Sequence, residues 1–216
     1  SRQDDKIAWY ENDGSQNFTE RVISTTADGA STVIAVDVDG DGDIDVLSAS
    51  RLDDKIAWYE NDGTQNFTAH TISADANFAT DVFVADVDND GDLDILSASY
   101  NDDKISWYEN DGSQIFTERI VSSNADEARS VFAIDVDGDG DLDVLSASEL
   151  DDKIAWYEND GNQTFTERVL ATSADRPTSV FATDVDGDGF INVGGDPNPD
   201  WSGCFYKTVA SWGKYA

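Results

Sequence analysis

The chain has 216 residues, of which 46 are acidic and 13 basic, which gives a formal net charge of −33 and an isoelectric point near 4.1. A surface of this charge repels the phosphates of nucleic acids and of anionic lipids, so we expect neither nucleic acid as a partner nor membrane insertion. Hydrophobic residues make up 39% of the chain and include six Trp, a composition that favours a folded protein over a disordered acidic one.

A 49-residue repeat organises residues 1–193. Trp recurs at positions 9, 58, 107 and 156, inside the nearly constant stretch DDKIAWYENDG. In chain order, the first copy contributes a predicted strand at 6–12, an Asn-Asp-Gly turn typical of hairpins, and a second strand at 18–24. Each later copy adds an apolar strand before an aspartate-rich string, as at 130–136, and another strand after it, as at 142–148.

Four antiparallel strands in a unit of 40 to 50 residues are the signature of a β-propeller blade. A β-sandwich is the alternative, but it would not need so constant a period. We therefore predict an all-β propeller with about four four-stranded blades per chain. The chain starts in a third strand and the repeat ends in a second strand. These ends either close the ring as a composite blade, share a larger ring with another chain, or belong to an arc of a longer propeller, although an open arc would leave unpaired edges, which proteins usually avoid.

Residues 194–216 depart from the repeat and are rich in Gly, Pro and aromatic residues, which suggests a cap or a docking tail. The domain prediction is thus a repeat region at 1–193 and a non-repeat tail at 194–216.

The aspartate strings have the spacing of a loop that binds a hard cation. Calcium prefers six to eight oxygen ligands, and short loops supply them from alternate residues. Each string places Asp at positions 1, 3, 5 and 9, Gly at position 6 for a sharp turn, and at position 7 a residue expected to offer its backbone carbonyl. The predicted ligands are Asp37, Asp39, Asp41, Asp43 and Asp45 in the first loop, Asp86, Asp88, Asp90, Asp92 and Asp94 in the second, and Asp135, Asp137, Asp139, Asp141 and Asp143 in the third.

These loops are not EF-hands, because Ser48, Ser97 and Ser146 occupy the place of the bidentate Glu and the flanking segments favour strands. A fourth loop keeps Asp184, Asp186 and Asp188 but has Phe190 at position 7 and Asn192 at position 9. We expect this loop to bind calcium more weakly, if it binds at all.

The DxDxDGxxD string, with the WYENDG and Phe-Thr segments that follow it, resembles the FG-GAP or VCBS repeat family. Blades of this family also form the calcium-binding propeller of integrin α subunits. The resemblance covers residues 1 to about 193. It implies an extracellular or cell-surface, calcium-stabilised propeller used for adhesion or carbohydrate binding, sometimes attached to an enzyme. Most members carry about seven blades, whereas this chain has material for four.

The copies vary mainly in two connections, which lie at the end of the blades opposite the aspartate strings. Variation confined to one face is what a ligand-binding surface would show, although neutral drift in exposed turns predicts the same pattern. The candidate ligand-binding residues are Arg51, Phe78, Tyr100, Arg129, Glu149 and Arg176. The repeated Trp could stack on sugars, but we expect them to form the core between blades.

We predict a protein without enzymatic activity, because His70 and Cys204 are the sole His and Cys and neither lies in a nucleophile motif. The predicted function is an extracellular binding or adhesion module that uses calcium as a cofactor and binds a protein or a glycan. The alternatives are a structural subunit of a homo-oligomer or filament, and a propeller fragment of a polysaccharide-active enzyme.

Overall fold

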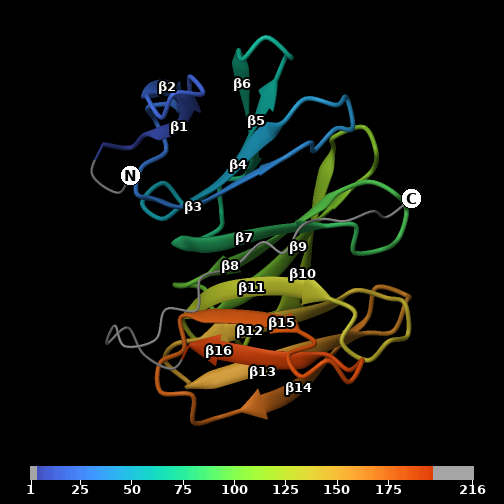
Figure 1. Ribbon diagram of the computed structural model, residues 1–216. Helices are drawn as coiled ribbons and strands as arrows, with labels where there is room; N and C mark the ends of the chain where they lie inside the picture. The colour runs from blue at the N-terminus through green and yellow to red at the C-terminus, as the bar shows by residue number, and fades with distance from the viewer. Residues whose placement is uncertain (1–3, 197–216) are drawn as a thin grey trace.

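The computed structural model describes residues 4–196, which form sixteen strands (Figure 1). Within this range no helix could serve as a membrane span. The strands that precede the aspartate strings are β3 (Ala30–Val36), β7 (Ala79–Ala85), β11 (Ala128–Ile134) and β15 (Ser179–Thr183). The strands that follow the strings are β4 (Asp45–Ser50), β8 (Asp94–Ser99), β12 (Asp143–Ser148) and β16 (Asn192–Asp196).

The Trp-containing segments form the third strand of each unit, and an Asn-Asp-Gly hairpin connects it to the fourth. The third strands are β1 (Ile7–Asn12), β5 (Lys55–Asn61), β9 (Lys104–Asn110) and β13 (Lys153–Asn159). The fourth strands are β2 (Phe18–Ser24), β6 (Phe67–Ser73), β10 (Phe116–Ser122) and β14 (Phe165–Ala171). The predicted strand types and their order are therefore present in every copy that the structure describes.

Three antiparallel sheets of four strands make the complete blades of the propeller, in the orders β3-β4-β5-β6, β7-β8-β9-β10 and β11-β12-β13-β14. The first strands lie side by side, because β7 contacts β3 on one side and β11 on the other, and β11 contacts β15. The second strands are the most buried, and β4, β8 and β12 are buried along their whole length. These blades confirm the predicted all-β propeller.

The expected composite blade is not formed within the described residues. Strands β1 and β2 pair only with each other in one sheet, and β15 and β16 do so in another. Figure 1 shows β1 and β2 at the upper left of the view, whereas β15 and β16 lie in the lower part, in front of the last complete blade. The four units thus form an open arc, and a ring shared between chains stays a prediction. Of the predicted tail, residues 197–216 lie outside the described residues.

The core lies between neighbouring blades, as expected for large aromatic residues. Trp107 is fully buried and packs with residues of the next blade, including Val131 and Tyr157. Trp58 is buried in the equivalent cluster between the first two complete blades. Trp9 and Trp156 are partly exposed. The described Trp therefore do not form a uniform ring of exposed stacking platforms.

The repeated Asp-Asp pairs connect each blade to the next. The second Asp of each pair has a positive φ, and its Oδ1 accepts a hydrogen bond from a backbone amide of the following unit. The amide of Phe78 lies 2.8 Å from Asp54, and the amide of Glu127 lies 2.9 Å from Asp103. The first Asp pairs with the nearby Lys, as in the 2.7 Å contact between Asp53 and Lys55. Much of the repeated acid therefore joins blades together.

Candidate functional site

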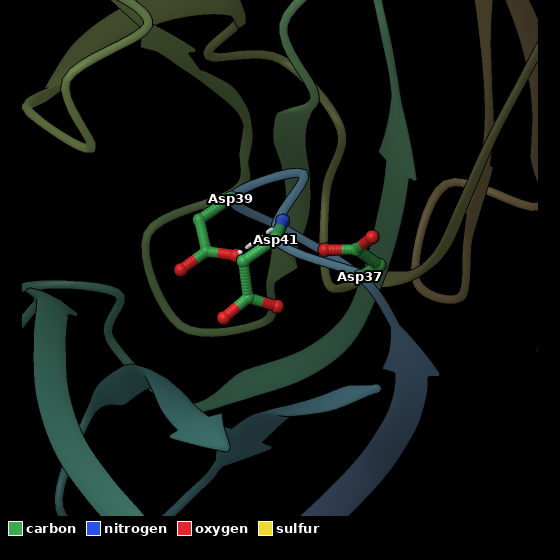
Figure 2. Close-up of side chains that lie close together, drawn as sticks. All are labelled: Asp37, Asp39 and Asp41. Atoms are coloured by element: carbon green, nitrogen blue, oxygen red, sulfur yellow. Dashed lines mark hydrogen bonds between the residues drawn. The ribbon is translucent and has the colours of Figure 1, made fainter. Parts of the chain in front are cut away.

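The aspartates of the first loop gather on one turn, as Figure 2 shows. Asp37, Asp39 and Asp41 each offer a carboxylate oxygen, and these oxygens lie within 4.8 Å of one another. Clusters that meet the same distance limit occur in the other loops, with Asp86, Asp88 and Asp90 in the second, Asp135, Asp137 and Asp143 in the third, and Asp184, Asp186 and Asp188 in the fourth. The third cluster therefore includes the Asp at position 9 in place of the one at position 5. Four clusters in the described residues could therefore hold a metal ion.

Backbone amides of the loop hold these carboxylates in place. The two oxygens of Asp37 accept hydrogen bonds from Gly40 and Gly42, at 2.9 and 3.0 Å. The Asp41 amide donates to Asp39 at 3.2 Å, the contact drawn in Figure 2. Gly42 has a φ of +96°, a conformation that side chains other than Gly rarely adopt. The loop is thus shaped by its own sequence into a concave set of oxygens.

The Asp at position 9 ties the loop to the blade. Asp94 is fully buried, and its two oxygens accept hydrogen bonds from the amides of Val87 at 3.0 Å and Asn110 at 2.8 Å. Burial raises the pKa of Asp94 to about 6, although both amides act in the opposite direction. A carboxylate oxygen has two lone pairs, so a residue in this position can hold the backbone and still face a cation.

The Asp at position 7 has a role that the sequence analysis missed. The carboxylate of Asp43 lies against the glycine of the Asn-Asp-Gly hairpin in the same blade, where a Cβ on Gly63 would come within 2.5 Å of Oδ2. Asp92 and Gly112 repeat this contact, as do Asp141 and Gly161. The constant spacing of the two motifs was the available signal. The expected ligand role of the position 7 carbonyl stays a prediction.

The fourth loop keeps the frame and loses charge. Asp184 accepts hydrogen bonds from the amides of Gly187 at 2.7 Å and Gly189 at 3.0 Å. Asn192 accepts one from Val185 at 2.9 Å, as Asp94 does from Val87. Phe190 is 74% exposed. Asn192 therefore preserves the link to the blade but brings no negative charge to the cluster.

The clusters fit calcium in their donor chemistry. All donors are oxygens, as a hard cation requires, and three or more carboxylates lie on one short loop. Burial raises the pKa of Asp88 and of Asp137, and the neighbouring Asp90 and Asp139 raise it further. Both causes penalise the charged carboxylate, and a divalent cation would offset them. Calcium, if bound, would supply positive charge that neutralises and rigidifies the loop.

A hollow of about 780 Å³ lies at the opposite end of the blades. It is bordered by the starts of β3, β7, β11 and β15 together with the connections next to them. All six residues predicted from the variable connections line it, namely Arg51, Phe78, Tyr100, Arg129, Glu149 and Arg176. The structure therefore brings together residues that lie up to 125 positions apart in the sequence.

The lining residues form a continuous row across three blades. The guanidinium of Arg51 lies 5.4 Å from the ring centroid of Phe78, whose ring is 5.4 Å from that of Tyr100. The guanidinium of Arg129 lies 4.3 Å from the ring centroid of Tyr100. Burial, followed by a hydrogen bond to Glu127, raises the pKa of Tyr100 and favours the neutral phenol.

The row ends in an ion-pair triad. Both Arg129 and Arg176 pair with Glu149, whose side chain is 5% exposed. Arg129 binds one carboxylate oxygen and Arg176 binds the other. The Arg176 side chain is 67% exposed, so its guanidinium reaches from the buried carboxylate into solvent.

A β-bulge brings Arg129 into this row. The register of β11 shifts between Ala128 and Ser130, which leaves Arg129 outside the regular pairing, and bulges of this kind redirect a side chain. The sequence analysis assigned Arg129 to a connection, but it belongs to β11, because the strand begins two residues earlier than expected.

Sequence reasoning missed several polar residues that also line the hollow. The Thr80 hydroxyl lies 2.8 Å from the carbonyl of Ala128 in the next blade. Asp81 accepts a hydrogen bond from Ser130, at 2.9 Å. The available signal was that Asp81 replaces the Thr or Ser found at the same place in the other copies. These contacts join the inner strands at the edge of the hollow.

The geometry of the blades and loops agrees with a family comparison. The model of the FG-GAP-like repeat matches residues 1–48, 37–97, 86–146 and 135–193. The chain belongs to the FG-GAP-like repeat family. The comparison with curated proteins found no significant match.

Solved structures show the same fold for these FG-GAP-like repeats. An Agrocybe aegerita lectin, described as specifically recognising non-reducing terminal N-acetylglucosamine, is 19% identical with a TM-score of 0.55, and the match covers 84% of this chain and 52% of the lectin. A Lactobacillus plantarum protein is 17% identical with a TM-score of 0.55, over 78% of this chain and 50% of that one. The V. cholerae biofilm matrix protein Bap1 is 24% identical with a TM-score of 0.50, over 81% and 24%. The chain thus spans about half the length of the lectin and of the Lactobacillus plantarum protein, and about a quarter of Bap1.

The single His of the chain takes the place of an Arg that recurs in the other repeats. Arg119 pairs with Glu109 and lies over the ring of Trp107, with 5.4 Å between guanidinium and ring centroid. His70 takes the equivalent place, stacks on Trp58 with ring centroids 4.7 Å apart, and contacts Glu60 at 2.7 Å. The sequence placed His70 outside any nucleophile motif but did not reveal this packing role, which His70 shares with the repeated Arg.

Proposed function

We propose that this chain is an extracellular, calcium-stabilised propeller that binds a carbohydrate or protein ligand and has no catalytic role. The observation that carries the proposal is the division of the molecule into two ends. One end repeats the same loop of clustered carboxylates, whereas the variable residues gather at the other end around one hollow. A rigid scaffold that presents variable loops is a common basis for recognition.

Calcium would be held by the carboxylates of the first three loops, and more weakly by those of the fourth. Loops of this kind in extracellular modules typically have Kd values of roughly 10⁻⁴ to 10⁻³ M, which suits a secreted or cell-surface location better than the cytosol. The predicted ligand sets remain those given above. The role of the ion would be to neutralise the loop, so that the hairpins and the hollow at their far ends keep a fixed geometry.

A binding role is further supported by the fold relatives. One of the similar structures is a lectin described as recognising N-acetylglucosamine, and another is a biofilm matrix protein. The hollow offers paired Arg and Glu, two aromatic rings and several hydroxyls, which are binding groups. Within residues 4–196, His70 lies in the packing contact with Trp58 and away from this hollow, so we assign it no catalytic part.

Two measurements test the proposal. Thermal unfolding in millimolar calcium and then in excess EGTA tests the metal, and we expect a clear fall in Tm on chelation. At millimolar calcium and a Kd of roughly 10⁻⁴ to 10⁻³ M, each site contributes about 0.4 to 1.4 kcal/mol to the free energy of unfolding. An unchanged Tm would contradict the calcium part of the proposal.

The binding part is tested on immobilised glycans and extracellular matrix proteins with the chain and with a variant in which Arg51, Tyr100 and Arg129 are replaced by Ala. We expect binding by the first and loss by the second, with the variant still showing the calcium-dependent rise in Tm. Equal binding by both proteins would place the ligand elsewhere.

A second candidate function is a structural subunit of an assembly. Strands β1 and β2, and likewise β15 and β16, form half-blades with two strands each, and the half-blade of one copy could complete that of another. Native mass spectrometry tests this alternative. A monomer at micromolar concentration would count against it, and a discrete dimer would support it.

A further inference from the structure

The distribution of positive charge in the chain singles out the hollow. Of the ten Lys and Arg in residues 4–196, seven follow the 49-residue spacing. The four Lys pair with Asp next to the blade connections, and the repeated Arg of the fourth strands pair with Glu on the third strands. The three that break the spacing are Arg51, Arg129 and Arg176, and all of them line the hollow.

The hollow therefore differs in charge from the rest of the molecule. Its lining holds three Arg against two acidic residues, Asp81 and Glu149, a surplus of positive charge in a chain with a net charge of −33. Both acids are buried, with residue exposures of 6% and 4%, whereas Arg176 is exposed. A ligand that enters the hollow would meet the guanidinium groups before the carboxylates.

Glu149 positions two guanidinium groups without using all their donors. A guanidinium has five N–H donors, and Glu149 has two oxygens to offer. Arg176 reaches Glu149 through one terminal nitrogen, and this contact uses only part of the donor capacity of its guanidinium. Arg129 reaches Glu149 through its Nε and one terminal nitrogen while its guanidinium plane lies against Tyr100. This arrangement holds fixed donors at the edge of the hollow, the geometry that suits a carboxylate.

The rest of the lining suits a sugar better than an acidic peptide. The rings of Phe78 and Tyr100 offer apolar surface next to the Arg pair. The hydroxyls of Ser31, Thr178 and Ser179 can both donate and accept, as sugar hydroxyls require. A run of acidic side chains would need a donor or cation at every residue, whereas the lining offers three Arg and otherwise mainly hydroxyls and aromatic rings.

We propose that the hollow binds a carboxylate-bearing sugar, a uronic acid residue of an acidic polysaccharide, with its carboxylate on Arg129 and Arg176 and its ring beside Tyr100 and Phe78. This inference rests on the proposed binding function and names the ligand class. The negative charge of the remaining surface directs an acidic polysaccharide to the hollow, because the polysaccharide is repelled elsewhere on the molecule.

The experiment compares uronate oligosaccharides with their carboxyl-reduced counterparts, which keep the ring and its hydroxyls and lose the charge. The probes are immobilised oligogalacturonate, oligoguluronate and hyaluronan hexasaccharide, each with its reduced form, together with a poly-glutamate peptide. All are measured against the calcium-loaded full chain. We expect at least one uronate to bind tenfold or more tightly than its reduced form, with an affinity that falls as salt concentration rises.

Three variants locate the site. We expect Arg176→Gln and Arg129→Gln to weaken uronate binding about 10- to 100-fold, the effect of losing a hydrogen bond to a charged group. Arg168→Gln is the matched control, because Arg168 also pairs with a Glu and lies over an aromatic ring but belongs to β14, outside the hollow. It should change the affinity less than twofold. Arg176 is exposed, so Arg176→Gln tests the site even if Arg129→Gln does not fold.

Each other outcome has a defined meaning. Equal binding of uronates and reduced forms, lost in the Arg176 variant, would overturn the acidic sugar and leave the binding function intact. Binding of poly-glutamate without any uronate would replace the sugar with an acidic peptide. Binding that Arg168→Gln and Arg176→Gln weaken equally would show a non-specific charge effect and overturn the site. Failure of every probe, together with failure on the glycan and matrix panel, would count against the proposed function itself.

Discussion

The two ends of the blades differ in how much the repeated copies vary. At the end with the aspartate loops, each complete copy keeps the same carboxylates, the same position 6 Gly and the same buried Asp at position 9. At the end with the hollow, Arg51, Tyr100 and Glu149 occupy equivalent places in three copies and share no chemistry. The loop end therefore behaves as a set of equal parts, and the hollow end as one combined site.

This difference follows from what each end contacts. A loop cluster draws its carboxylates from one loop, and the amides that hold its position 9 Asp come from the same blade. A neighbouring blade adds only a side contact, as when Gln163 donates to Asp88. The hollow is built by four successive blades, so each copy can supply a different group. A substitution at the loop end should thus affect stability first, and one at the hollow end should affect binding first.

The largest effect on stability is expected at position 9. Asp94→Ala removes the acceptor for the amides of Val87 and Asn110, and unsatisfied buried groups cost about 1–3 kcal/mol each. We expect a loss of about 3 kcal/mol in the free energy of unfolding in urea, measured in EGTA so that the metal plays no part. Asp94→Asn keeps one acceptor and should lose less, whereas Arg176→Gln should stay within about 0.5 kcal/mol, as surface changes do. Similar losses for Asp94→Ala and Arg176→Gln would contradict the division between the ends.

A second effect is a pH dependence of the calcium-free protein. Burial raises the folded-state pKa of Asp94 to about 6, and those of Asp143 and Asp88 are also raised. Between about pH 4 and pH 6 the folded state then holds more protons than the unfolded state, so the free energy of unfolding increases as pH falls through this window. In EGTA, we expect a higher Tm at pH 5 than at pH 7.

The control for this pH effect is Asp94→Asn, which should show a smaller rise in Tm between pH 7 and pH 5. In calcium the sign should weaken or reverse, since protons then compete with the metal. A Tm in EGTA that falls steadily from pH 7 to pH 5 would contradict the raised pKa values.

A smaller effect should show that the hollow end also has structural positions. Asp103→Ala removes the acceptor for the amide of Glu127, the contact that joins the second complete blade to the third. We expect a loss of about 1 kcal/mol by urea unfolding, typical of one hydrogen bond. The neighbouring Asn101→Ala, at the exposed tip of the same connection, is the matched control and should lose less. Equal losses of stability for the two variants would show that the Asp-Asp pairs do not join neighbouring blades.

The smallest effect is expected in the copy where His70 replaces the Arg that pairs with Glu in the other described copies. His70→Arg would give the pairing with Glu60 the permanent charge found in the other copies. Because both side chains are about 40% exposed, we expect a gain of no more than about 0.5 kcal/mol at pH 8. His70→Gln is the comparison that removes the charge. A loss of stability in His70→Arg would indicate that the His ring packs on Trp58 better than Arg does.

Much of the fold could be predicted, because the 49-residue period fixes the strand order and the Asn-Asp-Gly turns fix the hairpins. The predicted strands at 18–24 and 142–148 agree with the observed β2 and β12 within one residue. The start of β11 was misplaced because a bulge at Arg129 adds a residue that the alternation of apolar residues does not reveal. Closure could not be predicted, because the period gives the number of units but not the angle between them.

The candidate sites show the same limit. The clustering of Asp37, Asp39 and Asp41 follows from alternate spacing on a short turn, so sequence alone could indicate it. Asp45 accepts hydrogen bonds from the backbone amides of both Val38 and Asn61. The second bond depends on a strand end sixteen residues away, so it could not be predicted from the loop sequence. Variation between copies correctly selected residues of the hollow, but not that Glu149 joins two Arg, since that contact needs the curvature of the arc.

The β-bulge at the start of β3, β7 and β11 has a consequence for how such a protein could change. Residues 31, 80 and 129 stand outside the pairing register, so their side chains are not assigned to either face of the sheet. Ser, Thr and Arg already occupy them in the same backbone. Thr80 is buried and donates to the carbonyls of Ala98 and Ala128, so it is fixed by its contacts. Positions 31 and 129 are less constrained and can accept new side chains without moving a strand, so a library varied at these two positions would alter selectivity while leaving the propeller foldable. The repeat would thereby serve as a fixed frame with exchangeable contacts.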